Sequence, residues 1–174
     1  MMNSKWFWLV LLLVVCLACQ EKPKKTVEIP KQEMKQSMET ANRYLLNEEE
    51  EEIERYVKRH GWEMVKTGTG LRYQIVRQGT GDRIKQGDVV SLDYELYSLQ
   101  GELVYSSKTD GVKSFKVGEG AVETGLDEAM SYLHYGDLAN LILPFYLAYG
   151  LHGDDNKIPG YATLVYLIKI NEIQ

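Results

Sequence analysis

Downstream of Gly61, the apolar residues of this chain recur at every second position. The first such run spans residues 71–75, and two further runs span residues 90–96 and 164–170. Because successive side chains of a β-strand point to opposite faces of a sheet, this pattern predicts strands with one buried face. Glycine-containing turn signals separate the runs. We therefore expect antiparallel strands to form the framework of the domain.

One short segment between the predicted strands has a helical period instead. Its apolar residues recur at three- and four-residue spacing: Leu126, Met130 and Leu133. Thr124 is the expected N-cap, Asp127 stands at the capping-box distance, and Gly136 ends the segment. An amphipathic helix of this length must bury its apolar stripe against a sheet face, which predicts an α+β domain. We place the start of that domain at Trp62 and its end at residue 174.

Residues 1–18 have the features of an export signal. Lys5 supplies a positive charge, and residues 6–18 form an apolar run that is shorter than the about 20 residues of a membrane-spanning helix. The end of this run resembles the bacterial lipobox, which implies that Cys19 is acylated and becomes the mature N-terminus. Cys16 stands where the lipobox usually has leucine. The alternatives are an ordinary secretory signal cut near Ala18 and an uncleaved anchor, and all three place the protein outside the cytoplasm.

Residues 19–61 are predicted to form a lipid-attached tether followed by a helical spacer. The stretch 20–30 is polar and contains two prolines, which favours a flexible linker. Four apolar residues then lie on one face of a predicted helix: Met34, Met38, Ala41 and Leu45. Asn47 is expected to cap a second helical segment, which ends at Gly61. The apolar face either packs on the domain or pairs with a second copy of the chain in a homodimer.

Composition argues against several functional classes. The chain has 20 basic and 25 acidic residues and a net charge of -5. We expect no nucleic-acid partner, because phosphate binding needs clustered lysine and arginine. Both cysteines precede residue 20, so the mature domain is expected to lack an internal disulfide. The three histidines are scattered and no paired-cysteine or HExxH motif occurs, so neither a metal nor another cofactor is expected.

Three segments of the domain together resemble the signature of the FKBP-type peptidyl-prolyl cis-trans isomerases. They span residues 117–130, 147–150 and 158–166. The resemblance extends over residues 65–174, and it implies a twisted antiparallel β-sheet wrapped around one short helix, preceded here by the helical spacer. It also implies that the tyrosines of the domain, which on composition alone would favour a packed core, line an aromatic site between helix and sheet.

The resemblance assigns roles to individual residues. It implies three catalytic tyrosines: Tyr94, Tyr149 and Tyr166. It implies six substrate-binding residues: Val104, Tyr105, Val122, Glu123, Leu126 and Ile158. Tyr149 matches the tyrosine whose hydroxyl bonds a substrate carbonyl, and Glu123 matches a residue that acts through its backbone N–H. Val104 and Tyr105 stand where the family has a phenylalanine-aspartate pair, and Leu126 replaces a tryptophan.

The activity that the resemblance implies requires no nucleophile. Rotation about an Xaa–Pro bond breaks amide resonance and faces a barrier of about 18 to 20 kcal/mol, and a dry aromatic pocket accelerates it by binding the twisted amide better than the planar one. We expect a peptidyl-prolyl cis-trans isomerase that acts on proline-containing segments of exported or envelope proteins, anchored by lipid to a membrane of the cell envelope and facing the periplasm. The alternatives are a non-catalytic FKBP-like chaperone or peptide-binding lipoprotein, and an envelope scaffold similar to the gliding-associated lipoproteins of the family.

Overall fold

The computed structural model describes residues 30–171 of the chain. In chain order, its elements are α2 (Lys31–His60), β1 (Val65–Lys66), β2 (Arg72–Arg77), β3 (Val89–Ser98), β4 (Leu103–Ser106), α3 (Ser107–Asp110), β5 (Lys113–Lys116), α4 (Thr124–Met130), β6 (Leu138–Leu143), the 3-10 helix η1 (Phe145–Leu147) and β7 (Leu164–Ile170). They fall into two compact units, Met1–Thr40 and Ala41–Gln174. In the described range, no helix is long and apolar enough to cross a membrane. The predicted signal peptide, Cys19 and most of the tether lie outside the described residues.

The seven strands form one antiparallel sheet with the order β1-β2-β6-β7-β3-β4. β3 pairs with β7 along one edge, and its other edge is shared by β5 and β4. The three alternating runs of the sequence coincide with β2, β3 and β7. In β3, every second residue from Val90 to Leu96 is buried, as the alternation predicts. The predicted α+β class is confirmed.

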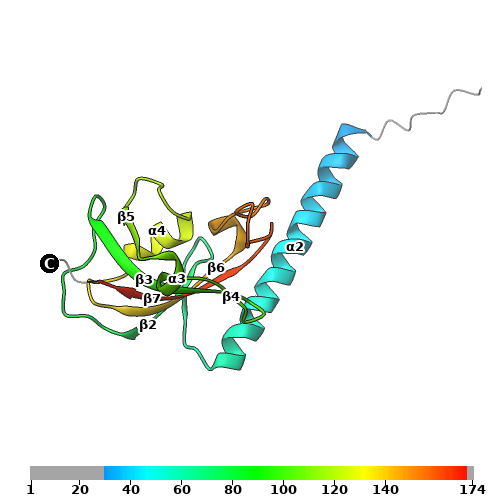
Figure 1. Cartoon of the computed structure of the whole chain (residues 1–174). Helices are drawn as coiled ribbons and strands as arrows, with labels where there is room; N and C mark the ends of the chain where they lie inside the picture. The colour runs from blue at the N-terminus through cyan, green and yellow to red at the C-terminus, as the bar shows by residue number, and fades with distance from the viewer. Residues whose placement is uncertain (1–29, 172–174) are drawn as a thin grey trace, which may run out of the picture. The chain divides into compact units, whose positions relative to one another are not determined.

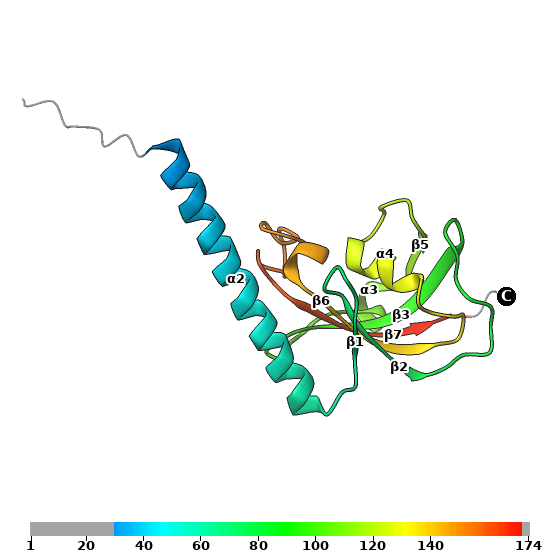
Figure 2. The same ribbon diagram turned by 180° about the vertical axis from the view of Figure 1, so that it is seen from behind.

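Helix α4 lies along one face of this sheet (Figures 1 and 2). Leu126 and Met130 of its predicted stripe are fully buried in the main core, as is Leu133, although α4 ends at Met130 and not at the predicted Gly136. Two details of its start differ from the prediction, because the N-cap is Glu123 and its side chain makes no capping bond. The expected capping box does not form either, since the Asp127 carboxylate accepts a hydrogen bond from the Gly118 N–H at 2.8 Å. The side chain of Glu123 is therefore available for another role.

The prediction of two helical segments before the domain is wrong, because α2 runs without a break from Lys31 to His60. Asn47 lies inside it, and an asparagine within a run of glutamates costs a helix only a fraction of a kcal/mol, about 0.7 or less. The predicted end is confirmed: Gly61 has a φ of 63°, and the Trp62 N–H bonds the Val57 carbonyl across it.

The C-terminal turns of α2 pack against the outer face of the sheet, opposite α4. Ile53 and Tyr56 are buried there with Ile142 of β6 and Val165 of β7, in a second, smaller core cluster. The compact unit accordingly includes the helix from Ala41 onward. The sheet in the second unit is thus covered on both faces over part of its area.

A polar contact joins the same helix to the sheet edge. Arg72, which faces outward from β2, is 2% exposed and donates to Glu50 at 2.6 Å and to Glu54 at 2.8 Å. Glu49 accepts the Phe145 N–H at 2.7 Å. Upstream of these contacts the predicted apolar face of α2 is exposed, with Leu45 at 42%. Its pairing with a second copy stays a prediction.

Candidate functional site

The three predicted catalytic tyrosines come together on the inner face of the sheet. Tyr94 projects from β3 and Tyr166 from the neighbouring strand β7, with ring centroids 6.0 Å apart. Tyr166 has no exposed surface, and Tyr94 is 8% exposed. Tyr149 follows η1 and is half-buried against the same core. Long-range strand pairing therefore gathers tyrosines that are separated by up to 72 positions in the chain (166 − 94).

A carboxylate lies at the centre of this group. The Glu123 side chain is 3% exposed, and its Oε1 accepts a hydrogen bond from the Tyr166 hydroxyl at 2.7 Å. Lys113 of β5 donates to the two carboxylate oxygens at 3.1 and 3.2 Å and to the Tyr166 hydroxyl at 3.1 Å. Its ammonium also lies 5.5 Å from the Tyr94 ring centroid and 5.4 Å from that of Tyr166. An ion pair thus lies among the aromatic rings.

The electrostatics of the site follow from this pair. Burial by itself raises the pKa of the Glu123 carboxyl, but the Lys113 charge and hydrogen bonding by Tyr149 and Tyr166 outweigh it, so this pKa lies below its ordinary value. Burial and the Glu123 carboxylate together raise the pKa values of the Tyr149 and Tyr166 hydroxyls. Both tyrosines therefore keep their protons at neutral pH, and the Tyr166 hydroxyl donates to the carboxylate while it accepts a hydrogen bond from Lys113.

The orientation of the Glu123 side chain differs from the sequence-based expectation. The resemblance assigns it a backbone role in which its side chain takes no part. In the structure the side chain turns into the site, where its own backbone N–H and the Tyr149 hydroxyl both help to lower its pKa. The resemblance assigns the Tyr149 hydroxyl to a substrate carbonyl and gives the Glu123 backbone N–H a role in the site, so the carboxylate competes with a substrate for these donors.

Tyr105 stabilises a neighbouring loop. Its hydroxyl donates to Asp154 at 2.5 Å, and the Lys157 ammonium lies 4.6 Å from its ring centroid. Asp154 also accepts the Ile158 N–H at 2.7 Å. Because its hydrogen bond goes to Asp154, the Tyr105 hydroxyl orders residues 154–158 and does not replace the aspartate that the family has at this position.

The remaining predicted substrate-binding residues lie around the tyrosines at different depths. Val104 and Val122 are half-buried and pack against the main core. Ile158 is 3% exposed, and Leu126 has no exposed surface. Leu126 therefore belongs to the core beneath the site. The substrate contacts of all four residues stay predictions.

Lys113 is the residue of this site that sequence reasoning missed. It lies on β5 two residues before Phe115, which is buried, and it pairs with Leu92 of β3. Residues two apart on a strand share a face, so Lys113 occupies an inward position. A lysine on the inward face of a strand is the signal that could have identified it, because charged residues are rarely buried unless they are paired.

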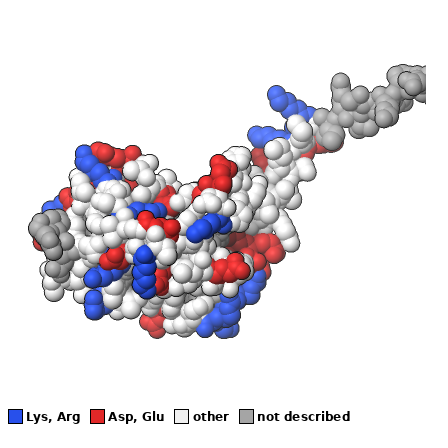
Figure 3. Space-filling view, in the orientation of Figure 1, with Lys and Arg blue, Asp and Glu red and all other residues white. Residues whose placement is uncertain are grey.

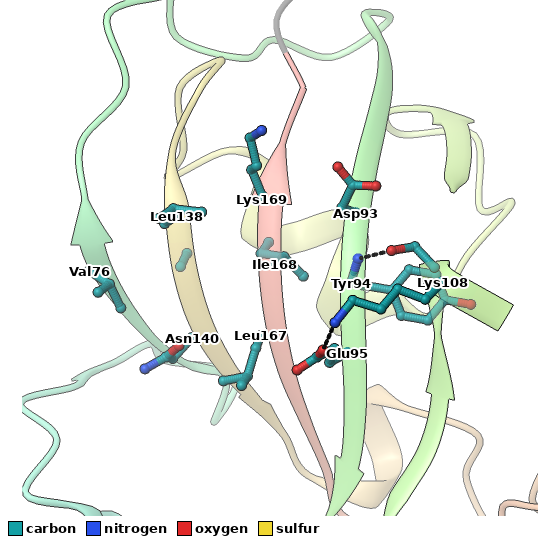
Figure 4. A pocket seen from close by; sticks show the side chains of 12 residues that line it. Val76, Asp93, Tyr94, Glu95, Lys108, Leu138, Asn140, Leu167, Ile168 and Lys169 are labelled. Atoms are coloured by element: carbon teal, nitrogen blue, oxygen red, sulfur yellow. Dashed lines mark hydrogen bonds and ion pairs between the residues drawn. The ribbon is translucent and has the colours of Figure 1, made fainter. Parts of the chain in front are cut away.

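The opposite face of the sheet carries a separate hollow of about 330 Å³. Figure 4 shows that it is lined by side chains from β2, β6, β7 and β3, with Lys108 reaching over from α3. Lys108 pairs with Glu95 at 3.1 Å, and Ser107 accepts the Tyr94 N–H at 3.2 Å. The sheet separates this hollow from the tyrosine site, although the Ser107 bond helps to hold the Tyr94 backbone in place.

Charged side chains of both signs are interspersed on the face shown in Figure 3. Among the described residues, charged side chains form close pairs, such as Lys116 with Glu119 at 2.6 Å and Lys66 with Glu50 at 2.5 Å. Mixed pairs of this kind cancel at long range. Recognition at the tyrosine site therefore depends on local groups more than on a field of one sign.

A family model described as FKBP-type peptidyl-prolyl cis-trans isomerase matches residues 81–171. The matched region contains Tyr94, Lys113, Glu123, Tyr149 and Tyr166. The chain belongs to the FKBP-type peptidyl-prolyl cis-trans isomerase family. The family predicted from three sequence segments is thereby confirmed.

Curated relatives agree with this FKBP-type assignment. A probable FKBP-type peptidyl-prolyl cis-trans isomerase FkpA from Neisseria meningitidis serogroup B is 34% identical over 108 residues, which cover 62% of this chain and 39% of that relative. FK506-binding protein 1 from Kluyveromyces lactis is 37% identical over 106 residues, covering 56% of this chain and 92% of that relative. The chain thus spans less than half of the FkpA relative and nearly all of FK506-binding protein 1.

A solved structure supports the same fold. The crystal structure of AtFKBP13 superposes with a TM-score of 0.61 and 24% sequence identity, over 64% of this chain and 99% of that chain. At this identity the likeness concerns architecture alone. The predicted FKBP-like sheet with one packed helix and an additional N-terminal helix is confirmed.

Proposed function

We propose that this FKBP-type chain catalyses cis-trans isomerisation of Xaa–Pro bonds at the site formed by Tyr94, Tyr149 and Tyr166. The observation that carries the proposal is the convergence of three tyrosines from β3, β7 and the loop after η1, within the region matched by the family model. The Tyr94 ring, which is 8% exposed, supplies apolar surface for a proline ring, and the fully buried Tyr166 ring lies beside it. The Tyr149 hydroxyl, protonated at neutral pH because its pKa is raised, supplies a donor for a peptide carbonyl.

In this mechanism the protein forms no covalent bond with the peptide. The twisted amide loses its resonance and with it part of its charge separation, so apolar ring surface beside the bond favours it over the planar forms. Tyr149 holds the peptide in one orientation while the bond rotates. The side chains of Val122 and Ile158 complete the apolar surroundings in this proposal.

Single hydroxyl deletions test the site. We expect Tyr149→Phe to lower kcat/KM for a proline tetrapeptide about tenfold, because one hydrogen bond to the bound peptide is lost. Tyr166→Phe keeps the ring and removes a donor to Glu123, so we expect a smaller loss. Tyr146→Phe is the matched control, since Tyr146 is 45% exposed. Turnover that is equal in Tyr149→Phe, Tyr166→Phe and wild type would exclude this site as the catalytic one.

A second candidate is a non-catalytic peptide-binding or chaperone module. The Glu123 carboxylate at the centre of the site supports it, because it competes for the donors that a substrate carbonyl needs. In that case calorimetry detects binding of proline-containing peptides without any acceleration of isomerisation. Absence of binding would end this alternative, and the scaffold alternative would then be preferred.

We further propose that the chain is an exported lipoprotein whose clients fold in the cell envelope. The support is the sequence of residues 1–19, with an apolar run that ends in Ala18-Cys19. The expected result is that wild type fractionates with membranes when expressed in a bacterium, whereas Cys19→Ala is released into the soluble envelope fraction. Equal fractionation of the two would remove the lipid anchor from the proposal.

Pairing of two copies through α2 is the remaining part of the proposal. Met34 and Met38, on the predicted apolar face, are 50% and 62% exposed, and a helix with exposed methionines gains from a partner. We expect sedimentation of the chain from Cys19 onward to show a dimer that Met34→Lys/Met38→Lys dissociates. A monomer at all concentrations would exclude the homodimer.

A further inference from the structure

We propose that Lys113 and Glu123 determine which prolyl peptides this site accepts, and that the site favours an acidic residue immediately before the proline. This inference rests on the proposed isomerase function and adds a substrate class to it. It starts from the observation that the Glu123 carboxylate already accepts hydrogen bonds from Lys113 and Tyr166. The carboxylate of an acidic peptide can take the place of the Glu123 carboxylate at these donors.

The first step is that Glu123 has to move before a peptide can reach the donors. Its side chain is 3% exposed and accepts a hydrogen bond from the Tyr166 hydroxyl at 2.7 Å, while Tyr166 itself has no exposed surface. Any group that contacts the Tyr166 hydroxyl from outside must therefore take the place of the carboxylate. Glu123 can leave toward solvent, because its neighbour Thr124 is exposed at the start of α4.

The second step concerns Lys113 once Glu123 has left. The Lys113 side chain is 22% exposed, and its hydrogen bonds go to the two Glu123 oxygens and to Tyr166. A neutral peptide offers these donors one carbonyl oxygen as an acceptor. The Lys113 ammonium is then left without a counter-charge. Leaving a mostly buried charge unpaired is costly, because desolvation is no longer offset by an ion pair.

The third step identifies the peptide that avoids this cost. The side chain of the residue before proline branches from the carbon next to the carbonyl that Tyr149 is expected to bond. A glutamate or aspartate there carries a carboxylate toward Lys113, so the ion pair and the tyrosine acceptor are both restored. A lysine or arginine at the same position meets the Lys113 charge, and Lys157, over the ring of Tyr105, adds a second cation at the loop.

The decisive experiment compares four tetrapeptides that differ only in the residue before proline, which is Glu, Gln, Leu or Lys. We expect wild type to show a kcat/KM about tenfold higher for the Glu peptide than for the Gln peptide, the size of one charge-assisted hydrogen bond. Lys113→Met keeps the length of the side chain and removes its charge, so it should abolish this preference. Lys116→Met is the matched control, since Lys116 lies on the same strand, carries the same charge and is 48% exposed in its own ion pair.

Two results overturn the inference while the isomerase function stands. One is a wild-type preference for Leu or Gln over Glu, and the other is a Glu preference of equal size in wild type, Lys113→Met and Lys116→Met. If no variant accelerates any peptide, the isomerase function itself fails. Calorimetric binding of the same peptides then decides the inference: Glu selectivity that depends on Lys113 supports it, and equal affinities overturn it.

A second measurement does not depend on turnover. Glu123→Ala leaves Lys113, Tyr149 and Tyr166 without their carboxylate, so free acetate should bind in its place. We expect acetate to raise the thermal midpoint of Glu123→Ala more than that of wild type or of the surface control Glu119→Ala, because a ligand that binds only the folded state stabilises it. If Glu123→Ala does not fold, Glu123→Ser is used in the same way. Equal responses of all proteins to acetate would overturn the carboxylate site.

Discussion

At the scale of single residues, two charged side chains govern the site: Glu123 at the start of α4 and Lys113 on β5. Each is unfavourable in this position alone, because burial removes hydration that water supplies. Together they are linked by contacts of 3.1 and 3.2 Å and share the hydroxyl of Tyr166. The pair therefore behaves as one unit, and a change in either member alters both.

The exposed fractions of these two side chains are 22% for Lys113 and 3% for Glu123. The pair lies between β5 and the start of α4, and it is mostly buried on the Glu123 side.

Because the ion pair is mostly buried, its contribution to stability depends on pH. The pKa of Glu123 lies below its ordinary value in the folded state, so the pair stabilises the fold above the unfolded-state pKa of about 4.3 and loses this effect as pH falls through the lower folded-state pKa. We expect Glu123→Gln to lower the free energy of unfolding by about 2 kcal/mol at pH 7, because Lys113 loses its counter-charge. The difference from wild type should shrink as the pH falls below 4.5.

Urea denaturation of wild type and Glu123→Gln at a series of pH values between 7 and 3 measures this effect. Glu119→Gln is the control, since Glu119 forms an exposed pair with Lys116, and it should differ little from wild type throughout. A difference between Glu123→Gln and wild type that stays constant over this range would contradict the assigned role of the carboxylate.

At the scale of elements, the contact between α2 and β2 depends on a buried guanidinium. Arg72 is 2% exposed and bonds Glu50 and Glu54, but its Nη1 is buried without a partner among the described residues. The two carboxylates are far more accessible, with side chains 39% and 62% exposed. Removing the Arg72 guanidinium and removing the Glu50 and Glu54 carboxylates should therefore change the free energy of unfolding by different amounts.

We expect Arg72→Met to change the free energy of unfolding by less than about 1 kcal/mol, because an apolar side chain of similar length replaces a charge that is costly to bury. The double variant Glu50→Ala/Glu54→Ala should cost about 3 kcal/mol, since it leaves the guanidinium buried and unpaired. Urea denaturation of both proteins measures the two values. The reverse order would show that the carboxylates, and not Arg72, determine the energy of this contact.

At the scale of the whole molecule, the helix before the sheet belongs to the core of the second unit. Ile53 has no exposed surface and Tyr56 is 6% exposed, and both cover Ile142 and Val165 on the outer face of the sheet. Burying a large apolar side chain contributes about 1.5 to 3 kcal/mol. The last turns of α2 therefore supply a substantial part of the stability of the domain.

Two truncations test this conclusion. We expect a chain that begins at Ala41 to unfold in urea with the same midpoint as the chain from Lys31, because residues 31–40 are exposed throughout. A chain that begins at Trp62 should lose about 3 kcal/mol or more, since Ile53 and Tyr56 are both removed. Equal stability of the chains from Ala41 and Trp62 would show that the domain starts at Trp62, as the sequence predicts.

Features that depend on neighbours along the chain could be predicted from the sequence alone. The alternation in β2, β3 and β7 requires only that one face of each strand is buried, and the stripe of α4 requires only a helical period. The glycine cap at Gly61 follows from the left-handed backbone that glycine adopts easily. The family also followed from local segments, because its signature residues are close together in the chain.

Only the tertiary structure decided features that depend on what covers a residue from elsewhere in the chain. Leu141, Ile142 and Leu143 of β6 are all fully buried, because the α4 side covers the first and third while α2 covers Ile142. Such a run has no period of two, so β6 was missed. The inward turn of Glu123 depends in the same way on Lys113, ten residues earlier (123 − 113) and on another element, because a carboxylate is buried only where a cation meets it.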